Sequence, residues 1–280
     1  MKHNIVGLGS AGNNIAKYFE QFPEYDVFKI DSEASGDEKE KNYFQVKEQD
    51  HPEKYEKNVP NLKKFFGDIE GNVLFIVGGS GFISAISLGV LEQIKHCNID
   101  ILYIKPDVDF LSEIRMKHER VVYGVLQEYA RSGVFQQMII VNNNDVEAMI
   151  GEISIDDYYS KINETIGFIL HSMNVLEHNK TIMNNFSPFV ETARISTIGM
   201  LEFEKDSENL FFPLDIIREK RYYYNVSQEK ASKDGKLYKK IREQIRNKKT
   251  GQTKVSYGIY SCSEKDNFVF VLAKSSEIQK

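Results

Sequence analysis

Apolar and polar positions alternate in blocks along the first half of the chain, and the blocks predict strands and helices in turn. Short apolar runs typical of strands occupy residues 4–9, 26–31, 72–78, 100–106 and 136–145. Stretches with helical periodicity follow at residues 13–19, 83–97 and 110–133. A polar, highly charged segment at 31–61 interrupts the series and predicts surface loops with short helical pieces. Apolar strands alternating with helices predict a parallel sheet covered on both faces.

The second half of the chain has a different pattern. Residues 157–178 carry Ile162, Ile166, Ile169, Leu170 and Met173 at helical spacing. Beyond Pro188, aromatic and β-branched runs predict strands, and residues 234–249 form a basic amphipathic helix. The predicted fold class is therefore α/β, with a Rossmann-like parallel-sheet nucleotide-binding domain at 1–156, a long central helix at 157–180, and a smaller α+β domain at 181–280.

Composition narrows the class of protein. The 280 residues carry a formal net charge of -5, so the overall charge does not indicate a nucleic-acid partner. The two cysteines, Cys97 and Cys262, lie far apart, and the six histidines show no clustered spacing, so we expect no metal site. No apolar run approaches the roughly 20 residues that span a bilayer. We expect a cytoplasmic protein with no membrane partner, and contact with nucleic acid only through an adaptor.

The first candidate site is the glycine-rich segment Gly7-Leu8-Gly9-Ser10-Ala11-Gly12, between a predicted strand and a predicted helix. Such a loop lays phosphate groups on the N-terminus of a helix. Asp31 follows 19 residues after Gly12, where dinucleotide-binding proteins keep an acid for the ribose hydroxyls. These features leave a nicotinamide cofactor and another nucleotide equally open.

A second glycine cluster, Gly78, Gly79, Ser80 and Gly81, again joins a strand to a helix. Backbone N–H groups in such a turn form an anion cradle, to which the helix dipole contributes. The alternative interpretation is a tight turn that needs small residues for packing. Two cradles at the carboxyl ends of neighbouring strands favour a nucleotide with several phosphates.

The order of these motifs resembles the tubulin/FtsZ superfamily of GTP-binding cytoskeletal proteins over nearly the whole chain. IVGLGSAGNNIA is similar to that family's first phosphate loop, and GGSG stands in place of its glycine-rich signature. IKPDVDFLSEIRM, IIVNNND and DDYYSKINETI resemble, in the same order, its Lys-Pro turn and helix, its strand ending in Asn-Asp, and the start of its central helix.

The resemblance implies that the chain binds GTP or GDP, with or without Mg²⁺. The residues it implies at the phosphates are Gly9, Ser10, Ala11, Gly12, Gly78, Gly79, Ser80 and Gly81. Those implied at the ribose or base are Asn14, Glu113, Arg115, Tyr159 and Asn163, with Arg115 also near the phosphates. Tyr159 would stack on guanine, and Asn163 would bond its edge. Without the resemblance, Tyr159 reads as a core aromatic and Asn163 as an exposed polar residue.

Two departures from the family bear on mechanism. Phe82 and Ile83 replace a Thr and a Gly in the glycine signature, so we expect altered phosphate contacts and a narrower pocket. In the loop MNNFSPFVETAR, Phe186 and Phe189 occupy the two positions where the family has acids that position water. A phenyl ring cannot deprotonate water, which leaves Glu191 as the candidate catalytic residue. We expect slow or absent GTP hydrolysis.

Three hypotheses follow. The first is a GTP-binding protein that assembles with itself, head to tail, into filaments, since the family's interface is heterologous. The second is a non-hydrolysing tubulin-like scaffold or regulator. The third is an NAD-dependent oxidoreductase, which leaves GGSG and the Tyr159 segment unexplained.

Overall fold

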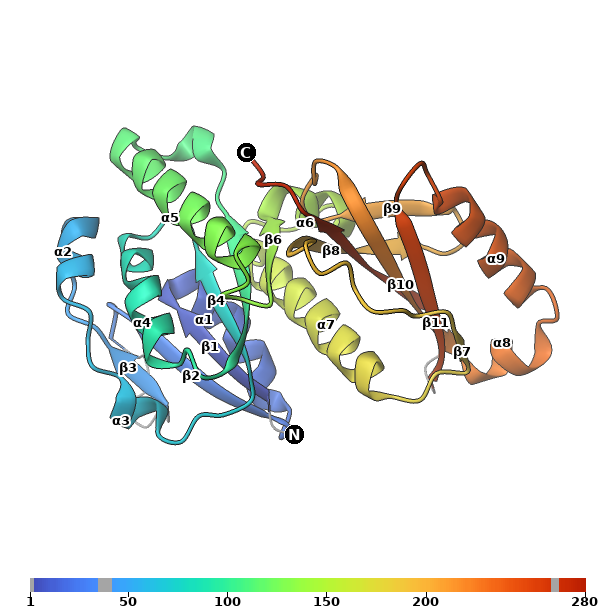
Figure 1. The fold of residues 1–280 in the computed structure, drawn as a ribbon, viewed down its shortest axis with the longest axis horizontal. Coiled ribbons are helices and arrows are strands. Elements are labelled where there is room, and N and C mark those ends of the chain that lie inside the picture. Colours follow the sequence, from blue (N-terminus) through green and yellow to red (C-terminus); the bar gives the residue numbers. More distant parts are fainter. Residues whose placement is uncertain (1–2, 35–41, 263–266) are drawn as a thin grey trace. The chain divides into compact units, whose positions relative to one another are not determined.

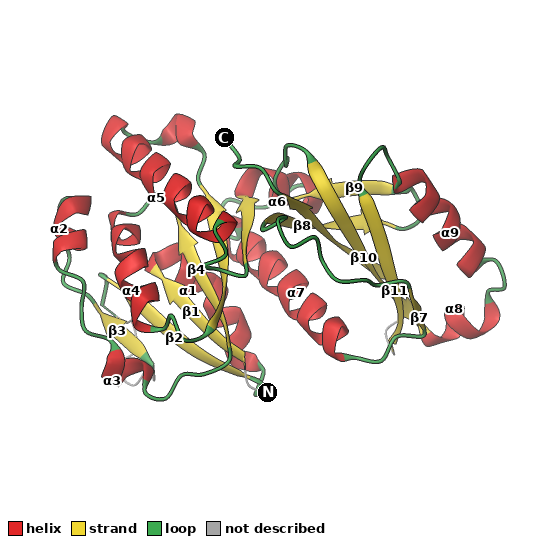
Figure 2. Cartoon of the chain, in the orientation of Figure 1, coloured by secondary structure: helices red, strands yellow, loops and turns green. Residues whose placement is uncertain are grey.

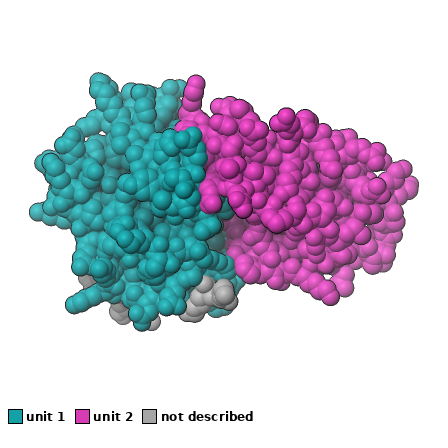
Figure 3. Space-filling view, in the orientation of Figure 1, with its two compact units in different colours: residues 1–167 teal, residues 168–280 magenta. Residues whose placement is uncertain are grey.

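The computed structural model describes residues 3–34, 42–262 and 267–280. The chain forms two compact units, Met1–Gly167 and Phe168–Lys280 (Figure 3). The division falls inside one continuous helix, α7 (Tyr158–His178). This helix covers most of the segment expected at 157–180.

The first unit is built on a parallel sheet with the strand order β3-β2-β1-β4-β5-β6 (Figure 1). Its strands are β1 (His3–Leu8), β2 (Tyr25–Asp31), β3 (Tyr43–Gln45), β4 (Asn72–Gly78), β5 (Asn98–Lys105) and β6 (Gln137–Asn142). Its helices before α7 are α1 (Gly9–Tyr18), α2 (Pro52–Lys57), α3 (Lys63–Phe66), α4 (Ser87–Gln93), α5 (Glu113–Arg131) and α6 (Asn143–Ile150). Consecutive positions of β1 are buried, as expected for a strand covered on both faces. All six strands place their carboxyl ends at one edge.

The second unit contains a mixed sheet with the order β8-β12-β10-β11-β7, and β9 pairs with β8 (Figure 2). The strands are β7 (Met183–Asn184), β8 (Ile195–Glu202), β9 (Ser207–Leu210), β10 (Ile217–Ser227), β11 (Lys254–Cys262) and β12 (Phe268–Ser275). β10 and β11 run parallel because α8 (Gln228–Lys233) and α9 (Leu237–Lys248) connect them. Leu237, Ile241 and Ile245 of α9 belong to a buried cluster with Tyr222 and Tyr224 of β10.

The predicted fold class is confirmed: a parallel α/β unit, a long central helix and a smaller α+β unit. Several local expectations differ from the structure. The segment at 31–61, expected to lack strands, contributes β3, and β7, β8 and β9 also lie outside the predicted strands. The helix expected at 83–97 begins as a 3-10 turn, Phe82–Ile86, before α4. Within the described ranges, no helix is long and apolar enough to cross a membrane.

Candidate functional site

The first glycine segment changes from strand to helix without any spacer. β1 ends at Leu8 and α1 begins at Gly9, whose φ of 72° suits glycine. No side chain caps this N-terminus, and its first turn contains no acid. A Cβ on Gly12 would lie 2.3 Å from the carbonyl oxygen of Ile76, so this turn rests directly on β4. The result is a helix N-terminus whose N–H groups and positive dipole end suit an anion.

Asn13, which the sequence interpretation passed over, holds this turn in place. Its side chain accepts from the N–H of Ile30 at 3.3 Å and donates to the Ile30 carbonyl at 3.2 Å. It also donates to Asp31 at 3.4 Å, as Ser10 does at 3.3 Å. Asp31 is buried and its carboxylate ties β2 to α1, instead of projecting as an acid for a ribose. Asn14, the next residue along the helix, is exposed.

The second glycine cluster lies against the first. A Cβ on Gly78 would meet the Cβ of Ala11 at 3.0 Å, so the two turns touch. Gly79 donates its N–H to the Ile104 carbonyl at 3.0 Å, and a Cβ there would lie 2.2 Å from the Tyr103 hydroxyl. These glycines are therefore required by close packing, and the two turns form one surface at the carboxyl edge of the sheet.

The two bulky residues of this cluster lie on different sides of it. The ring of Phe82 packs against Arg115 and His118 of α5, with centroid distances of 4.7 and 5.8 Å. Ile83 is buried, with its Cγ2 atom 2.9 Å from the Cβ position of Gly9. Ile83, and not Phe82, is thus the residue placed between the two turns.

α5 supplies two residues that the sequence interpretation placed at the nucleotide. Arg115 donates from Nη1 to the carbonyl oxygen of Ser80 at 2.6 Å. Glu113 is exposed and forms an ion pair with Lys117 at 2.5 Å, one turn along the same helix. Arg115 therefore contacts the glycine turn itself, whereas Glu113 contacts neither glycine turn.

Tyr159 and Asn163 lie one turn apart on the same face of α7. Tyr159 is 66% exposed, with its ring edge-to-face against Tyr158 at 5.1 Å. Tyr158 donates to Glu147 of α6 at 2.9 Å, which places the start of α7 at the carboxyl edge. Burial and this carboxylate raise the pKa of Tyr158 to about 12. Tyr159 is therefore not a core aromatic, and its exposed ring is available for stacking.

α1 and α7 pack together in the same unit. A Cβ on Gly167 would lie 2.6 Å from the Tyr18 ring, so the helices are in contact there. Since both helices begin at the carboxyl edge, Asn14 and Asn163 each lie one turn before that contact. Asn14 and Asn163 thus each lie in the second turn of a helix that begins at this edge.

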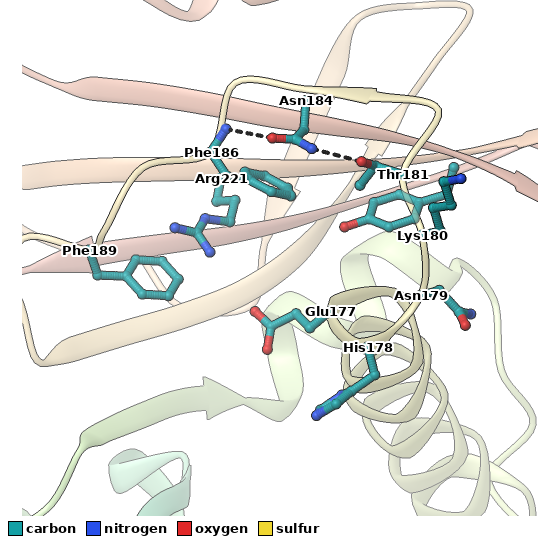
Figure 4. Close-up of a pocket in the computed structure, with 10 residues that line it drawn as sticks. Glu177, His178, Asn179, Lys180, Thr181, Asn184, Phe186, Phe189 and Arg221 are labelled. Atoms are coloured by element: carbon teal, nitrogen blue, oxygen red, sulfur yellow. Dashed lines mark hydrogen bonds between the residues drawn. The ribbon is translucent and has the colours of Figure 1, made fainter.

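The loop after α7 belongs to the second unit, and Figure 4 shows Phe186 and Phe189 on this loop and Arg221 of β10 beside it. Phe189 packs against two cations, with its centroid 3.5 Å from the Arg221 guanidinium and 4.3 Å from the Lys274 ammonium. The Phe186 ring lies 5.7 Å from that of Tyr223, over a position where only Gly258 leaves room. Arg221 also donates to the Ser187 carbonyl at 2.9 Å. Both phenylalanines therefore anchor the loop to the sheet.

The same loop borders a cavity of about 600 Å³ at the end of α7. Glu177, on its wall, accepts from Tyr223 at 2.5 Å. Burial, followed by the nearby Glu177 carboxylate, raises the pKa of Tyr223 well above its usual value. Glu191 is exposed, and it is not among the residues that line the cavity. Across the described ranges, no group of three His, Cys, Asp or Glu side chains could hold a metal ion.

Known proteins resemble this chain in structure and not detectably in sequence family. No protein-family model matches the sequence, and no curated protein matches it by sequence. Similar solved structures include a GTPγS-form protofilament of TubZ from Bacillus thuringiensis serovar israelensis, at 13% identity and a TM-score of 0.72, covering 98% of this chain and 86% of that one. An empty FtsZ dimer from M. jannaschii matches at 13% identity and a TM-score of 0.69, with coverages of 99% and 88%.

A GDP-bound monomer of CetZ1 from Haloferax volcanii matches at 16% identity and a TM-score of 0.66, covering 99% of this chain and 94% of that chain. These matches extend over both units, in agreement with the order of motifs in the sequence. At this level of identity they establish the fold, and the roles of individual site residues stay predictions. The chain has the tubulin/FtsZ-like fold.

Proposed function

We propose that this chain is a tubulin-like protein that binds guanine nucleotide and assembles with itself head to tail. The observation that carries the proposal is the contact between the two glycine turns, Gly9–Gly12 and Gly78–Gly81, at one edge of the sheet. Tyr159 and Asn163 belong to the first two turns of α7, whose start is bonded to α6 through Tyr158 and Glu147. An aromatic face and an amide suit a purine, and N–H groups at two turns suit several phosphates.

The glycine turns of the first unit suit a nucleoside triphosphate. Gly9, Ser10, Ala11 and Gly12 would hold phosphate oxygens with backbone N–H groups and the uncapped helix N-terminus. Gly81 would do the same from the second turn. When bound, the nucleotide would supply the negative charge that these N–H groups neutralise. The missing Cβ atom of Gly12 lets α1 lie directly on β4, and that of Gly78 lets the second turn approach Ala11 of the first. The two turns are then close enough to bind one ligand.

Self-association is supported by the similar structures, which include a TubZ protofilament and an FtsZ dimer. Slow or absent hydrolysis is supported by the loop after α7. Phe186 and Phe189 pack on the sheet of their own unit, and an apolar ring offers no base for water. Glu191 remains the exposed carboxylate of this loop. The same observation favours a second candidate, a tubulin-like scaffold that does not hydrolyse nucleotide.

The binding proposal is tested with purified protein and a fluorescent GTP analogue. Tyr159→Ala removes the exposed ring, and we expect at least about a fivefold loss of GTP affinity, since base stacking contributes about 1–3 kcal/mol. Tyr238→Ala is the matched control, because Tyr238 is 40% exposed on α9 of the other unit. NADH should not compete. Equal affinities of the two variants would contradict the assignment of Tyr159, and a lack of GTP binding by the unmodified chain would contradict the function.

Assembly is tested by light scattering with GTP, with a non-hydrolysable analogue and without nucleotide, while phosphate release is measured in parallel. The filament proposal expects assembly that requires GTP and persists for as long with GTP as with the analogue. Assembly without any nucleotide would favour the scaffold. Rapid phosphate release that survives Glu191→Gln would contradict the role given to Glu191.

A further inference from the structure

Two carbonyl oxygens of the second glycine turn, those of Ser80 and Gly81, contact side chains of α5, and the Gly81 carbonyl also accepts from the Ser84 N–H at 3.1 Å. Arg115 Nη1 donates to the Ser80 carbonyl at 2.6 Å. The Gly81 carbonyl accepts from Ser84 Oγ at 2.8 Å, and His118 Nε2 lies 3.2 Å from it. His118 Nε2 is also 2.8 Å from Ser84 Oγ. Two consecutive carbonyls are therefore fixed by side chains.

The protonation of His118 follows from this arrangement. The hydroxyl proton of Ser84 is used on the Gly81 carbonyl, so Ser84 Oγ can only accept from His118. The Gly81 carbonyl is also an acceptor. Nε2 must then carry the proton that both oxygens share. Burial lowers the pKa of His118, in keeping with a neutral imidazole in this position.

Because the peptide group is planar, a carbonyl that is held in place also fixes the direction of the following N–H group. In a trans peptide the C=O of one residue and the N–H of the next lie in one plane and point in opposite directions. Because the Ser80 and Gly81 carbonyls face α5, the N–H groups of Gly81 and Phe82 face the other way. The first turn of α1 lies beside this turn, since Gly78 meets Ala11.

Phe82 completes the arrangement. Its ring packs on the Arg115 guanidinium at 4.7 Å and edge-to-face on His118 at 5.8 Å. The ring is thus directed to α5 and limits the movement of both donors. Phe82 therefore holds the Arg115 and His118 side chains in place, on the side of the turn opposite to the Gly81 and Phe82 N–H groups.

We propose that Arg115 and His118 are positioning residues, which keep the Gly78–Gly81 turn in the anion-binding conformation before any ligand arrives. Arg115 thereby acts through the Ser80 carbonyl instead of binding the nucleotide directly. The proposal rests on the proposed nucleotide-binding function and adds how the cradle is maintained. Hydrogen-bond donors that are fixed in advance bind an anionic ligand more tightly, because no free energy of binding is used to order them.

The first test uses protein without nucleotide, labelled with ¹⁵N-glycine. Arg115→Met and His118→Leu should shift the amide signals of Gly79 and Gly81, since each removes a bond to the turn. His118→Gln keeps an amide donor near the position of Nε2 and should restore the signals. Arg120→Met, at an exposed cation of the same helix, is the control and should leave them unchanged. Unchanged signals in both Arg115→Met and His118→Leu would overturn the proposal.

The second test compares ligands with and without phosphates. Each of the two disruptive variants should weaken GTP binding about tenfold, since a hydrogen bond from a charged or buried donor contributes about 1.5 kcal/mol. Affinity for guanosine should stay within about twofold. An equal loss for GTP and guanosine would overturn the positioning role in favour of general destabilisation. If the unmodified chain binds no GTP, the proposed function fails, while the glycine signals still decide whether the turn is held from α5.

Discussion

Gly12→Ala tests the close contact between α1 and β4. An ideal Cβ on Gly12 would lie 2.3 Å from the Ile76 carbonyl oxygen and 3.1 Å from its carbon. These are backbone atoms of a central strand, so neither a rotamer change nor a flexible side chain relieves the overlap. Overpacking of this kind costs about 1–3 kcal/mol, and more where the backbone is rigid. Alanine returns up to about 1 kcal/mol as a better helix former. We expect a net loss of up to about 2 kcal/mol, or more if the strand backbone does not yield.

The chain offers a matched control in Gly124, inside α5. A Cβ at Gly124 would meet nothing within 4 Å. Gly124→Ala should therefore gain about 0.5–1 kcal/mol, because alanine loses less conformational entropy in a helix. Both variants make the same chemical change in a helix, and they differ in the space available.

Urea unfolding followed by circular dichroism measures both changes. The midpoint should fall for Gly12→Ala and rise for Gly124→Ala at an unchanged slope. Gly12→Ala should also lose GTP affinity, because the first turn of α1 must move away from β4. An unfolding midpoint for Gly12→Ala at or above that of the unmodified chain would refute the argument from close contact.

Two further predictions concern other parts of the chain. Phe189→Leu should lower the unfolding free energy by about 1–2 kcal/mol, since it removes contacts with two cations, whereas Phe189→Tyr should retain it; equal urea midpoints would contradict this. Because burial holds the pKa of His118 below 6.5, the unfolded chain binds more protons, and stability should fall as the pH drops below about 6.5. His118→Gln should show a smaller decrease in urea midpoint between pH 7 and 5, and an identical decrease would count against this cause.

The sequence predicts those features that depend on local chemistry. Apolar runs between turns identify five of the six strands of the first sheet, with β3 missed. Gly9 is recognisable as a turn glycine, and the structure gives it a positive φ. The exposed ring of Tyr159 is anticipated only through the resemblance, because an aromatic residue on an apolar helix reads equally well as core. Motif order is thus informative where single residues are ambiguous.

The features that the sequence does not predict depend on contacts between distant segments. Asn13 and Asn14 are the same residue type at adjacent positions, so the sequence does not indicate which one contacts β2. In the structure Asn13 faces β2 and binds Asp31. The strand predicted at 136–145 ends at Asn142 in the structure, because the Asn142 side chain caps α6 by accepting from the Asp145 N–H at 2.7 Å. The bond from His118 to the glycine turn joins residues 37 positions apart, and no spacing rule signals it.

The anchoring of Phe189 bears on how easily hydrolysis could be gained. A carboxylate introduced by Phe189→Asp would lie between the Arg221 guanidinium and the Lys274 ammonium, where ion pairing would hold it. Such an acid would be held by these cations and would not be free to act on a water molecule. Phe186 is similarly held by the space that Gly258 leaves. Under the proposed function, a gain of hydrolysis would then require several coordinated substitutions in the loop and in three strands, and the proposed slow hydrolysis would be robust to single mutations.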